Sequence, residues 1–388
     1  MNVTSPRHRG RARRLALMLL FGSGCSAPGS ATAEVAAPEE PASVIAPTPA
    51  PEEPAPAPEE PAPEPAPPVV EVAAVDGLAP LTDAQRQQLG EGAEDPPIPV
   101  DIHYVQSNET RHDLFFPYIE GVGGAYVGVG SDQNFTMLAK ARSEFAFLMD
   151  IDHRVVGLHK IYAALIPKAE GPDDVIHYFH RDQKDATAAL LEQEFAALSD
   201  KERRALLVGF KGARETVYRH LLRVKTRRPR GGPVTWLSDP AMFAHIKKMH
   251  AQGRIRVMSG DLTGPDSLQT VARACGELGV PVAVLYMSNA EEFFDYTPGF
   301  VANIKALPGS DDAVILRTIY SKKWPHADLW SYQVQPLADL KRRLDDRKNS
   351  RRRHMLRWVR SDGDLREETG QQGLTLIALE PAQSGGNP

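Results

Sequence analysis

Residues 125–134, with the sequence A-Y-V-G-V-G-S-D-Q-N, decide the fold. A β-rich run ends at Gly128, and Gly130 completes a G-x-G turn. A second apolar run ends at Asp150, about twenty residues after that turn. Strand, glycine turn, helix, strand and acid follow one another in the opening unit of nucleotide-binding α/β domains. We therefore predict a domain that binds a nucleoside-containing cofactor.

The chain beyond this unit alternates apolar runs with helical patterns. The predicted strands are 118–122, 124–129, 145–151, 255–258, 282–287 and 313–317, with 330–335 and 374–379 as late candidates. Apolar runs separated by helices indicate a parallel sheet that is covered on both faces. We predict an α/β fold with a doubly wound, mostly parallel, Rossmann-like sheet and a helical insertion at about residues 158–232.

Polar residues follow the end of each predicted strand, where such sheets bind ligands. Gly128 and Gly130 would let the backbone approach a ligand, because they lack Cβ. Asp132 follows them, and Asp150 would accept hydrogen bonds from ribose hydroxyls. Asp261, in S-G-D-L-T-G, would accept from an adenine amino group. The alternatives are that the glycines only shape a turn, that Asp150 caps a helix, and that Asp261 belongs to a turn.

The turn after the fourth strand, S-N-A-E, would face the reactive end of the cofactor. Asn289 and Glu291 are its candidate catalytic residues, with Glu291 as a base if the acceptor needs deprotonation. Both residues could instead cap a helix. Asn108 and Glu109 could close over the site, although we interpret them as a surface loop.

The glycine turn departs from the dinucleotide pattern. G-x-G-x-x-G lets a pyrophosphate lie on a helix N-terminus, but Phe135 stands at the third glycine position. Asp132 places negative charge near that position, which disfavours NAD and tolerates the cationic amino group of S-adenosylmethionine. We expect no metal, because His245 and His250 are not spaced to share one helical face.

The segments Y-V-G-V-G-S-D-Q-N, S-G-D-L-T-G and L-Y-M-S-N-A-E-E-F-F, with the strand ending at Asp150, resemble class I methyltransferases over about residues 121–318. They resemble still more closely a family of bacterial lipoproteins with a methyltransferase-like domain. The resemblance implies a methyltransferase-like Rossmann fold with S-adenosylmethionine as cofactor. Two functions stay open: a methyltransferase, or a non-catalytic binding lipoprotein that keeps the fold.

The N-terminus has the outline of an export signal. A basic stretch over 7–14 precedes an apolar run over 15–21, and Cys25 follows small residues. We predict a signal peptide over 1–25 with lipidation at Cys25, a disordered Pro/Ala/Glu-rich linker over 26–78 and a domain over 79–388. The alternative is a plain signal peptide with an incidental cysteine. The expected location is the cell envelope, at the outer membrane or facing the periplasm. An exported enzyme would be separated from cytoplasmic S-adenosylmethionine.

A strongly basic stretch begins at Lys341 and ends at Arg360. As an amphipathic helix it could contact anionic lipid or acidic glycans. We expect no nucleic-acid partner for an exported protein, and a plain solvated helix is the alternative interpretation. The acceptor substrate is not indicated by any motif.

Overall fold

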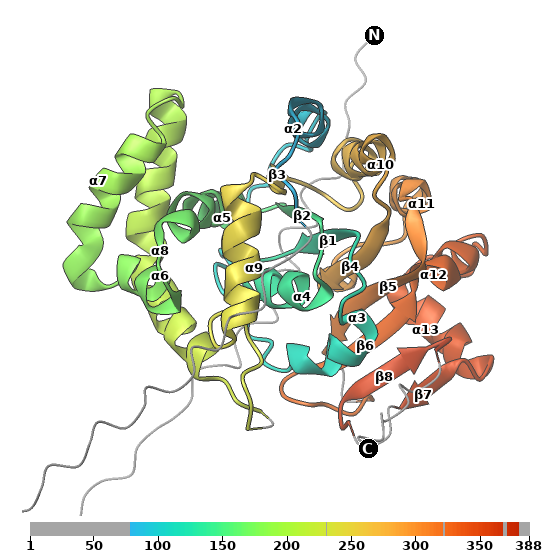
Figure 1. The fold of residues 1–388 in the computed structure, drawn as a ribbon. Helices are drawn as coiled ribbons and strands as arrows, with labels where there is room; N and C mark the ends of the chain where they lie inside the picture. The colour runs from blue at the N-terminus through green and yellow to red at the C-terminus, as the bar shows by residue number, and fades with distance from the viewer. Residues whose placement is uncertain (1–77, 230, 321–322, 368–370, 380–388) are drawn as a thin grey trace, which may run out of the picture. The chain divides into compact units, whose positions relative to one another are not determined.

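A mixed sheet of eight strands forms the centre of the domain (Figure 1). The computed structural model describes residues 78–379 except 230, 321–322 and 368–370. The predicted signal peptide, Cys25 and nearly all of the predicted linker lie outside the described residues. The strands are β1 Ala125–Val129, β2 Phe145–Asp150, β3 Ile255–Ser259, β4 Val282–Ser288, β5 Gly309–Ile319, β6 Ser331–Pro336, β7 Leu365–Glu367 and β8 Leu374–Ile377.

The strand order is β3-β2-β1-β4-β5-β6-β8-β7. The strands β1 to β5 pair in parallel. β6 runs antiparallel to β5, β8 runs parallel to β6, and β7 runs antiparallel to β8. The order 3-2-1-4-5 is that of the Rossmann sheet. Successive strands are added on one side of β1 up to β3 and on its other side from β4 onward, so the switch point lies between β1 and β4. The prediction of an α/β fold with a mostly parallel sheet is confirmed.

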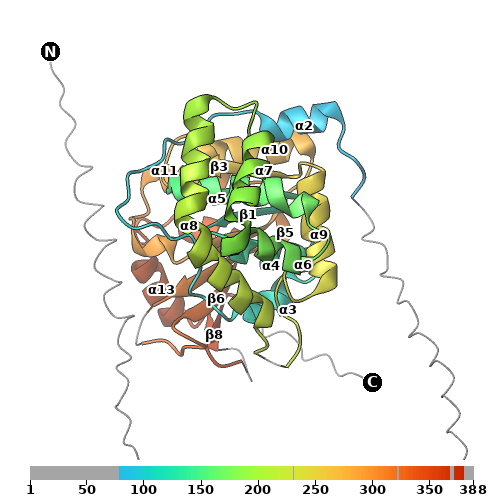
Figure 2. The same ribbon diagram turned by 90° about the vertical axis from the view of Figure 1, so that its left-hand side faces the viewer.

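Helices cover both faces of this sheet (Figures 1 and 2). They are α2 Asp83–Gly90, α3 Phe116–Ile119, α4 Gln133–Ala141, α5 His153–Leu165, α6 Pro172–Tyr178, α7 Lys184–Glu194, α8 Asp200–Thr226, α9 Pro240–Ala251, α10 Ser267–Leu278, α11 Pro298–Ala306, α12 Leu337–Arg343 and α13 Arg352–Ser361. Short 3-10 turns are η2 His112–Phe115, η3 Ile166–Lys168, η4 Arg181–Gln183 and η5 Ala290–Glu292.

Alternation along the strands divides the buried residues between two cores. In β1, Tyr126 packs in one core with Phe135 of α4 and Tyr162 of α5. Its neighbour Val127 packs in the other core with Phe300 of α11. The helical stretch expected at about 158–232 corresponds to α5–α8, in which α7 and α8 pack on α5 (Figure 2).

Two expectations about local structure are wrong. Residues 118–122 are not a strand, because α3 ends there and a turn follows in which Gly121, Gly123 and Gly124 all have positive φ. The basic stretch from 341 to 360 is not one helix. Asn349 donates to the carbonyl of Arg343, 2.8 Å away, in the turn that separates α12 from α13. Among the described residues, no helix is both long and apolar enough to cross a bilayer.

Candidate functional site

The segment before β1 lies across the carboxyl ends of the parallel strands. We call residues 94–113 the strap. Asp95 accepts hydrogen bonds from three backbone N–H groups after β3. Ile98 donates to the carbonyl just beyond β2, at 3.0 Å, and His103 contacts the N-cap carboxylate of α5, at 2.9 Å. Glu109 then reaches the ends of β4 and β5. The strap therefore borders the edge at which Rossmann sheets bind ligands.

The glycine turn after β1 is tied to β2 through Asp150. Gly130 has φ +90°, and its N–H donates to Asp150 Oδ2 at 3.1 Å. The other oxygen accepts from the N–H of Asp152 at 2.8 Å. Burial raises the pKa of Asp150 to about 6, although these backbone donors oppose the rise. The half-buried carboxylate is thus held at the carboxyl end of β2, against the turn that follows β1, where the sequence predicts the ribose acceptor.

The other glycine of the turn has a different role from the predicted one. A Cβ at Gly128 would overlap the side chain of Asn134. Asn134 Nδ2 donates to the carbonyls of Val129, at 3.0 Å, and Ser131, at 2.9 Å, and its Oδ1 accepts from Tyr126. Gly128 therefore admits a side chain of the turn itself, and we no longer assign it to the cofactor.

Asp132 points into the protein instead of toward a ligand. Its side chain is buried, lies 2.7 Å from His220 Nε2 and accepts from Trp236 Nε1 at 3.4 Å. Burial alone would raise the pKa of Asp132, but the charge and hydrogen bond of His220 outweigh it and lower the pKa. The sequence predicts that the negative charge of Asp132 would disfavour the pyrophosphate of NAD. His220 of α8 contacts this carboxylate inside the protein, so the charge of Asp132 is not a reason to exclude NAD.

Asp261 shapes the turn after β3. One of its carboxylate oxygens accepts from both the N–H and the hydroxyl of Thr263, each at 2.8 Å. Its own N–H donates to Asp95 of the strap at 3.2 Å. These contacts fit the alternative interpretation, in which Asp261 stabilises the turn after β3. Asp261 also stays half-buried, so its proposed contact with adenine remains a prediction.

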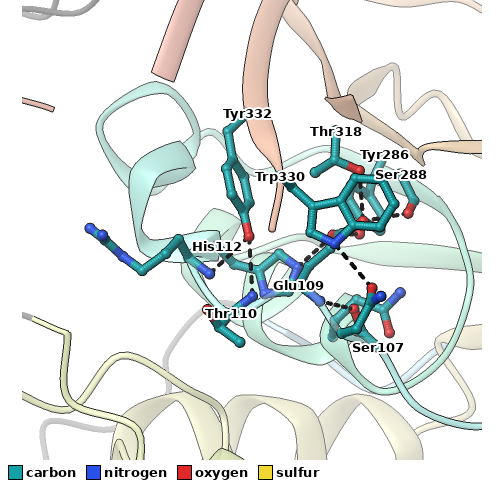
Figure 3. Close-up of polar contacts among 12 residues, drawn as sticks. Ser107, Glu109, Thr110, His112, Tyr286, Ser288, Thr318, Trp330 and Tyr332 are labelled. Carbon is teal, nitrogen blue, oxygen red and sulfur yellow. Dashed lines mark hydrogen bonds and ion pairs between the residues drawn. The ribbon is translucent and has the colours of Figure 1, made fainter. Parts of the chain in front are cut away.

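A buried carboxylate gathers four donors beneath the ends of β4 and β5 (Figure 3). Glu109 is 2% exposed. It lies 2.9 Å from His112 Nε2, and it accepts from Ser288 Oγ at 2.6 Å, from Thr318 Oγ1 at 2.7 Å and from the Tyr286 hydroxyl. Burial would raise the pKa of Glu109, but the hydrogen bond and charge of His112 and the hydroxyl donors lower it. Glu109 is therefore a fixed negative charge, and its interpretation as a surface loop is wrong.

The backbone at Ser288 is strained at the same place. Its φ is +48°, in the left-handed region that non-glycine residues seldom occupy. Its hydroxyl bonds to Glu109, and the residue stays half-buried at the end of β4. Strain of this kind is concentrated at functional sites. Sequence reasoning missed the cluster because its members come from three segments that are far apart in the sequence: the strap, β4 and β5.

A second layer of contacts holds the strap in place around Glu109. Asp328 Oδ2 accepts from the N–H and hydroxyl of Thr110, both at 2.7 Å, and from the Tyr332 hydroxyl at 2.9 Å. Trp330 Nε1 donates to Asn108 Oδ1 at 3.0 Å (Figure 3). These bonds connect the strap to β6 and the loop before it. The residues on either side of Glu109 in the sequence, Asn108 and Thr110, are therefore both held by hydrogen bonds.

The family model for a domain of unknown function, DUF7790, matches residues 104–378. The chain belongs to this family. None of the curated proteins compared with the chain matches it. The match includes Glu109 and all eight strands, whereas Asp95 and α2 precede it.

Two solved structures of the rRNA methyltransferase aviRa from Streptomyces viridochromogenes are similar to the chain. The first has 12% identity and a TM-score of 0.27, and covers 59% of this chain and 80% of that chain. The second has 14% identity and a TM-score of 0.26, and covers 63% of this chain and 85% of that chain. At such scores the likeness carries no inference about activity.

The two predicted catalytic residues are placed differently. Glu291 is buried, lies 2.7 Å from Arg317 Nε and accepts from the Tyr296 hydroxyl at 2.5 Å. Arg317 and Thr318 are adjacent in β5 and so point to opposite faces, which separates Glu291 from the Glu109 cluster. A base enclosed in an ion pair cannot approach an acceptor, so Glu291 is not retained as a base. Asn289 is half-buried at the N-cap of η5, makes no side-chain cap bond there, and stays a candidate.

The part of the chain that the structure describes contains no group of three or more His, Cys, Asp or Glu side chains suited to a metal ion. Cys275, which the sequence interprets as a small apolar residue, lies in the second core, and burial raises the pKa of its thiol to about 12.

Proposed function

We propose that the domain binds S-adenosylmethionine and transfers its methyl group to an acceptor. One observation carries the proposal: in a 3-2-1-4-5 sheet, the half-buried Asp150 at the end of β2 is bonded to Gly130 in the turn after β1. An acceptor at the end of the second strand suits ribose hydroxyls. The cofactor would supply an electrophilic methyl group.

The residues around Asp150 suit a nucleoside. Ser259 stands beside Asp150 in the register of β2 and β3. Its buried hydroxyl has no hydrogen-bond partner among the described residues. A buried hydroxyl without a partner costs free energy, and a ligand group could relieve that cost. Asp150 and Ser259 are therefore neighbouring polar residues at one edge of the sheet.

The same turn suits a dinucleotide less well. A pyrophosphate would need to approach Gly130 and the start of α4. The side chain of Gln133 folds back against Gly130 and accepts from Ser131 Oγ at 2.9 Å. The space in front of the helix is thus taken by the protein itself. This contact replaces the charge of Asp132 as our reason to prefer S-adenosylmethionine.

Glu109 acts through its neighbours in this proposal. It is too enclosed to touch an acceptor, so we assign it as a positioning residue that orients the hydroxyls of Tyr286 and Ser288. Ser288 and Asn289 are half-buried beside it and would face the acceptor. Catalysis would come mainly from holding two reactants together and excluding water.

Calorimetry of the full chain against S-adenosylmethionine, S-adenosylhomocysteine and NAD tests the proposal. We expect the first two to bind, and Asp150→Asn to weaken them about ten- to a hundredfold, the worth of a hydrogen bond to a charged group. Glu192→Gln, which removes an exposed acid of α7, is the matched control. Failure of both adenosyl ligands to bind, or equal binding by Asp150→Asn, contradicts it.

A second candidate function rests on the N-terminal sequence. The signal-like residues 1–25 and the linker after Cys25 favour an exported, lipid-anchored protein of the cell envelope. Such a protein would bind its ligand without methyl transfer, because the cofactor is made in the cytoplasm. Incorporation of labelled palmitate, lost in Cys25→Ser, tests the anchor. Binding of S-adenosylmethionine without transfer to any envelope fraction would favour this candidate.

A further inference from the structure

Five exposed cations lie on α13 and in the turn just before it. We call Arg347, Lys348, Arg353, Arg357 and Arg360 the basic face; all five are exposed. Within the described ranges none of the five forms an ion pair with a carboxylate, whereas their neighbours Arg351 and Arg352 both do. The basic face therefore carries charge that the fold leaves uncompensated.

The helix presents these cations outward because its apolar side is already used. Met355, Leu356 and Val359 are buried in the core on that face of the sheet. Arg353, Arg357 and Arg360 follow one another at spacings of four and three, so they share the opposite side of the helix. The apolar side is thus not available to a partner, and recognition must be electrostatic.

Two tryptophans accompany the cations. Trp358 is 39% exposed, and Lys348 Nζ lies 5.2 Å from its ring centroid. The guanidinium of Arg360 lies 4.9 Å from the ring of Trp324. Exposed tryptophan beside cations is typical of protein surfaces at the membrane–water interface.

The first turn of α13 adjoins the candidate site. Arg352, in the first turn of α13, donates to the carbonyl of Thr318 at 3.3 Å and to Glu292 at 2.8 Å. The hydroxyl of the same Thr318 donates to Glu109. Thr318, near the end of β5, thus connects the first turn of α13 with the Glu109 cluster.

We propose that the basic face docks the domain onto an anionic phospholipid surface. Each lysine or arginine near such a surface contributes a favourable attraction, and Trp358 can sit at headgroup level. The anchor expected at Cys25 would supply a second, independent attachment, and stable membrane binding usually needs two. The occupant is a lipid headgroup with a net negative charge, such as that of phosphatidylglycerol. Docking does not depend on the proposed methyl transfer.

Sedimentation with lipid vesicles tests this docking surface. The full chain is mixed with vesicles of phosphatidylcholine alone or with added phosphatidylglycerol. We expect the added anionic lipid to increase binding. Arg353→Gln/Arg357→Gln/Arg360→Gln should reduce that increase roughly a hundredfold, because three attractions are lost. The matched control, Lys201→Gln/Arg204→Gln/Lys211→Gln, removes three exposed cations of α8 and should bind like the wild type.

Salt provides a measurement that needs no variant. Near 1 M salt the Debye length is about 3 Å, so the anionic component of wild-type binding should disappear. The proposal is overturned if anionic lipid gives no increase, if both triple variants behave alike, or if the increase survives high salt. Binding of the wild type to single-stranded RNA, lost in the α13 variant while vesicles are ignored, would overturn it in favour of nucleic acid.

Discussion

Asp150→Asn should change how stability depends on pH. Burial raises the pKa of Asp150 to about 6 in the folded protein, against about 3.9 in an unfolded chain. Folding therefore favours the protonated acid. The contribution of this group to stability is fully present below about pH 4 and is lost as the pH rises through about 6. The gap between the two pKa values corresponds to about 3 kcal/mol.

Urea unfolding at several pH values, extrapolated to water, measures this contribution. The difference in unfolding free energy between wild type and Asp150→Asn should fall by about 3 kcal/mol from about pH 4 to pH 8, to the disadvantage of the wild type. Taking the difference cancels the titration of other groups. The exposed control Glu192→Gln should give a nearly flat difference. A flat difference for Asp150→Asn as well would refute the claim that burial raises the pKa of this carboxylate.

Two further substitutions test the buried charges. Glu109→Gln places an amide where two donors converge and should lower the unfolding free energy by about 2–4 kcal/mol, measured by urea unfolding; an unchanged midpoint would contradict the network in Figure 3. Arg317→Met leaves Glu291 buried without its partner and should cost about 3–5 kcal/mol, while Glu291→Leu combined with Arg317→Met should recover most of it. If the double variant is no better than the single one, the ion pair is not the cause.

The parallel part of the sheet could be predicted because its signal is local. Each strand from β1 to β4 is an apolar run bounded by glycine, proline or acid, and pairing adjusted the ends by only one residue. The strand predicted at residues 118–122 is wrong because this segment has few apolar residues and is followed by glycines. Phe115 and Ile119 are buried at helical spacing, and that pattern was too short to recognise.

For the candidate site, the sequence could place Asp150 at the carboxyl end of β2, and its contact with ribose stays a prediction. Asp150 is the last residue of β2, so its position beside the glycine turn follows from the end of the strand alone. Asp132 and Glu291 have the same local pattern. In the fold, however, Asp132 is buried against His220 of α8, and Glu291 is buried in an ion pair with Arg317 of β5. For Glu109 the error was the reverse: the sequence indicates an exposed loop, whereas the side chain is buried, and no neighbouring residue in the sequence indicates that burial. Long-range partners decide which carboxylates face a ligand.

A crystal structure of the chain with S-adenosylhomocysteine tests the central claim most directly. We predict the ribose hydroxyls within hydrogen-bond distance of Asp150, with the sulfur turned toward Ser288 and Asn289 at the end of β4. A nucleoside bound elsewhere, or an edge at which the strap and Asp150 meet no ligand at saturating concentration, would contradict the proposed function.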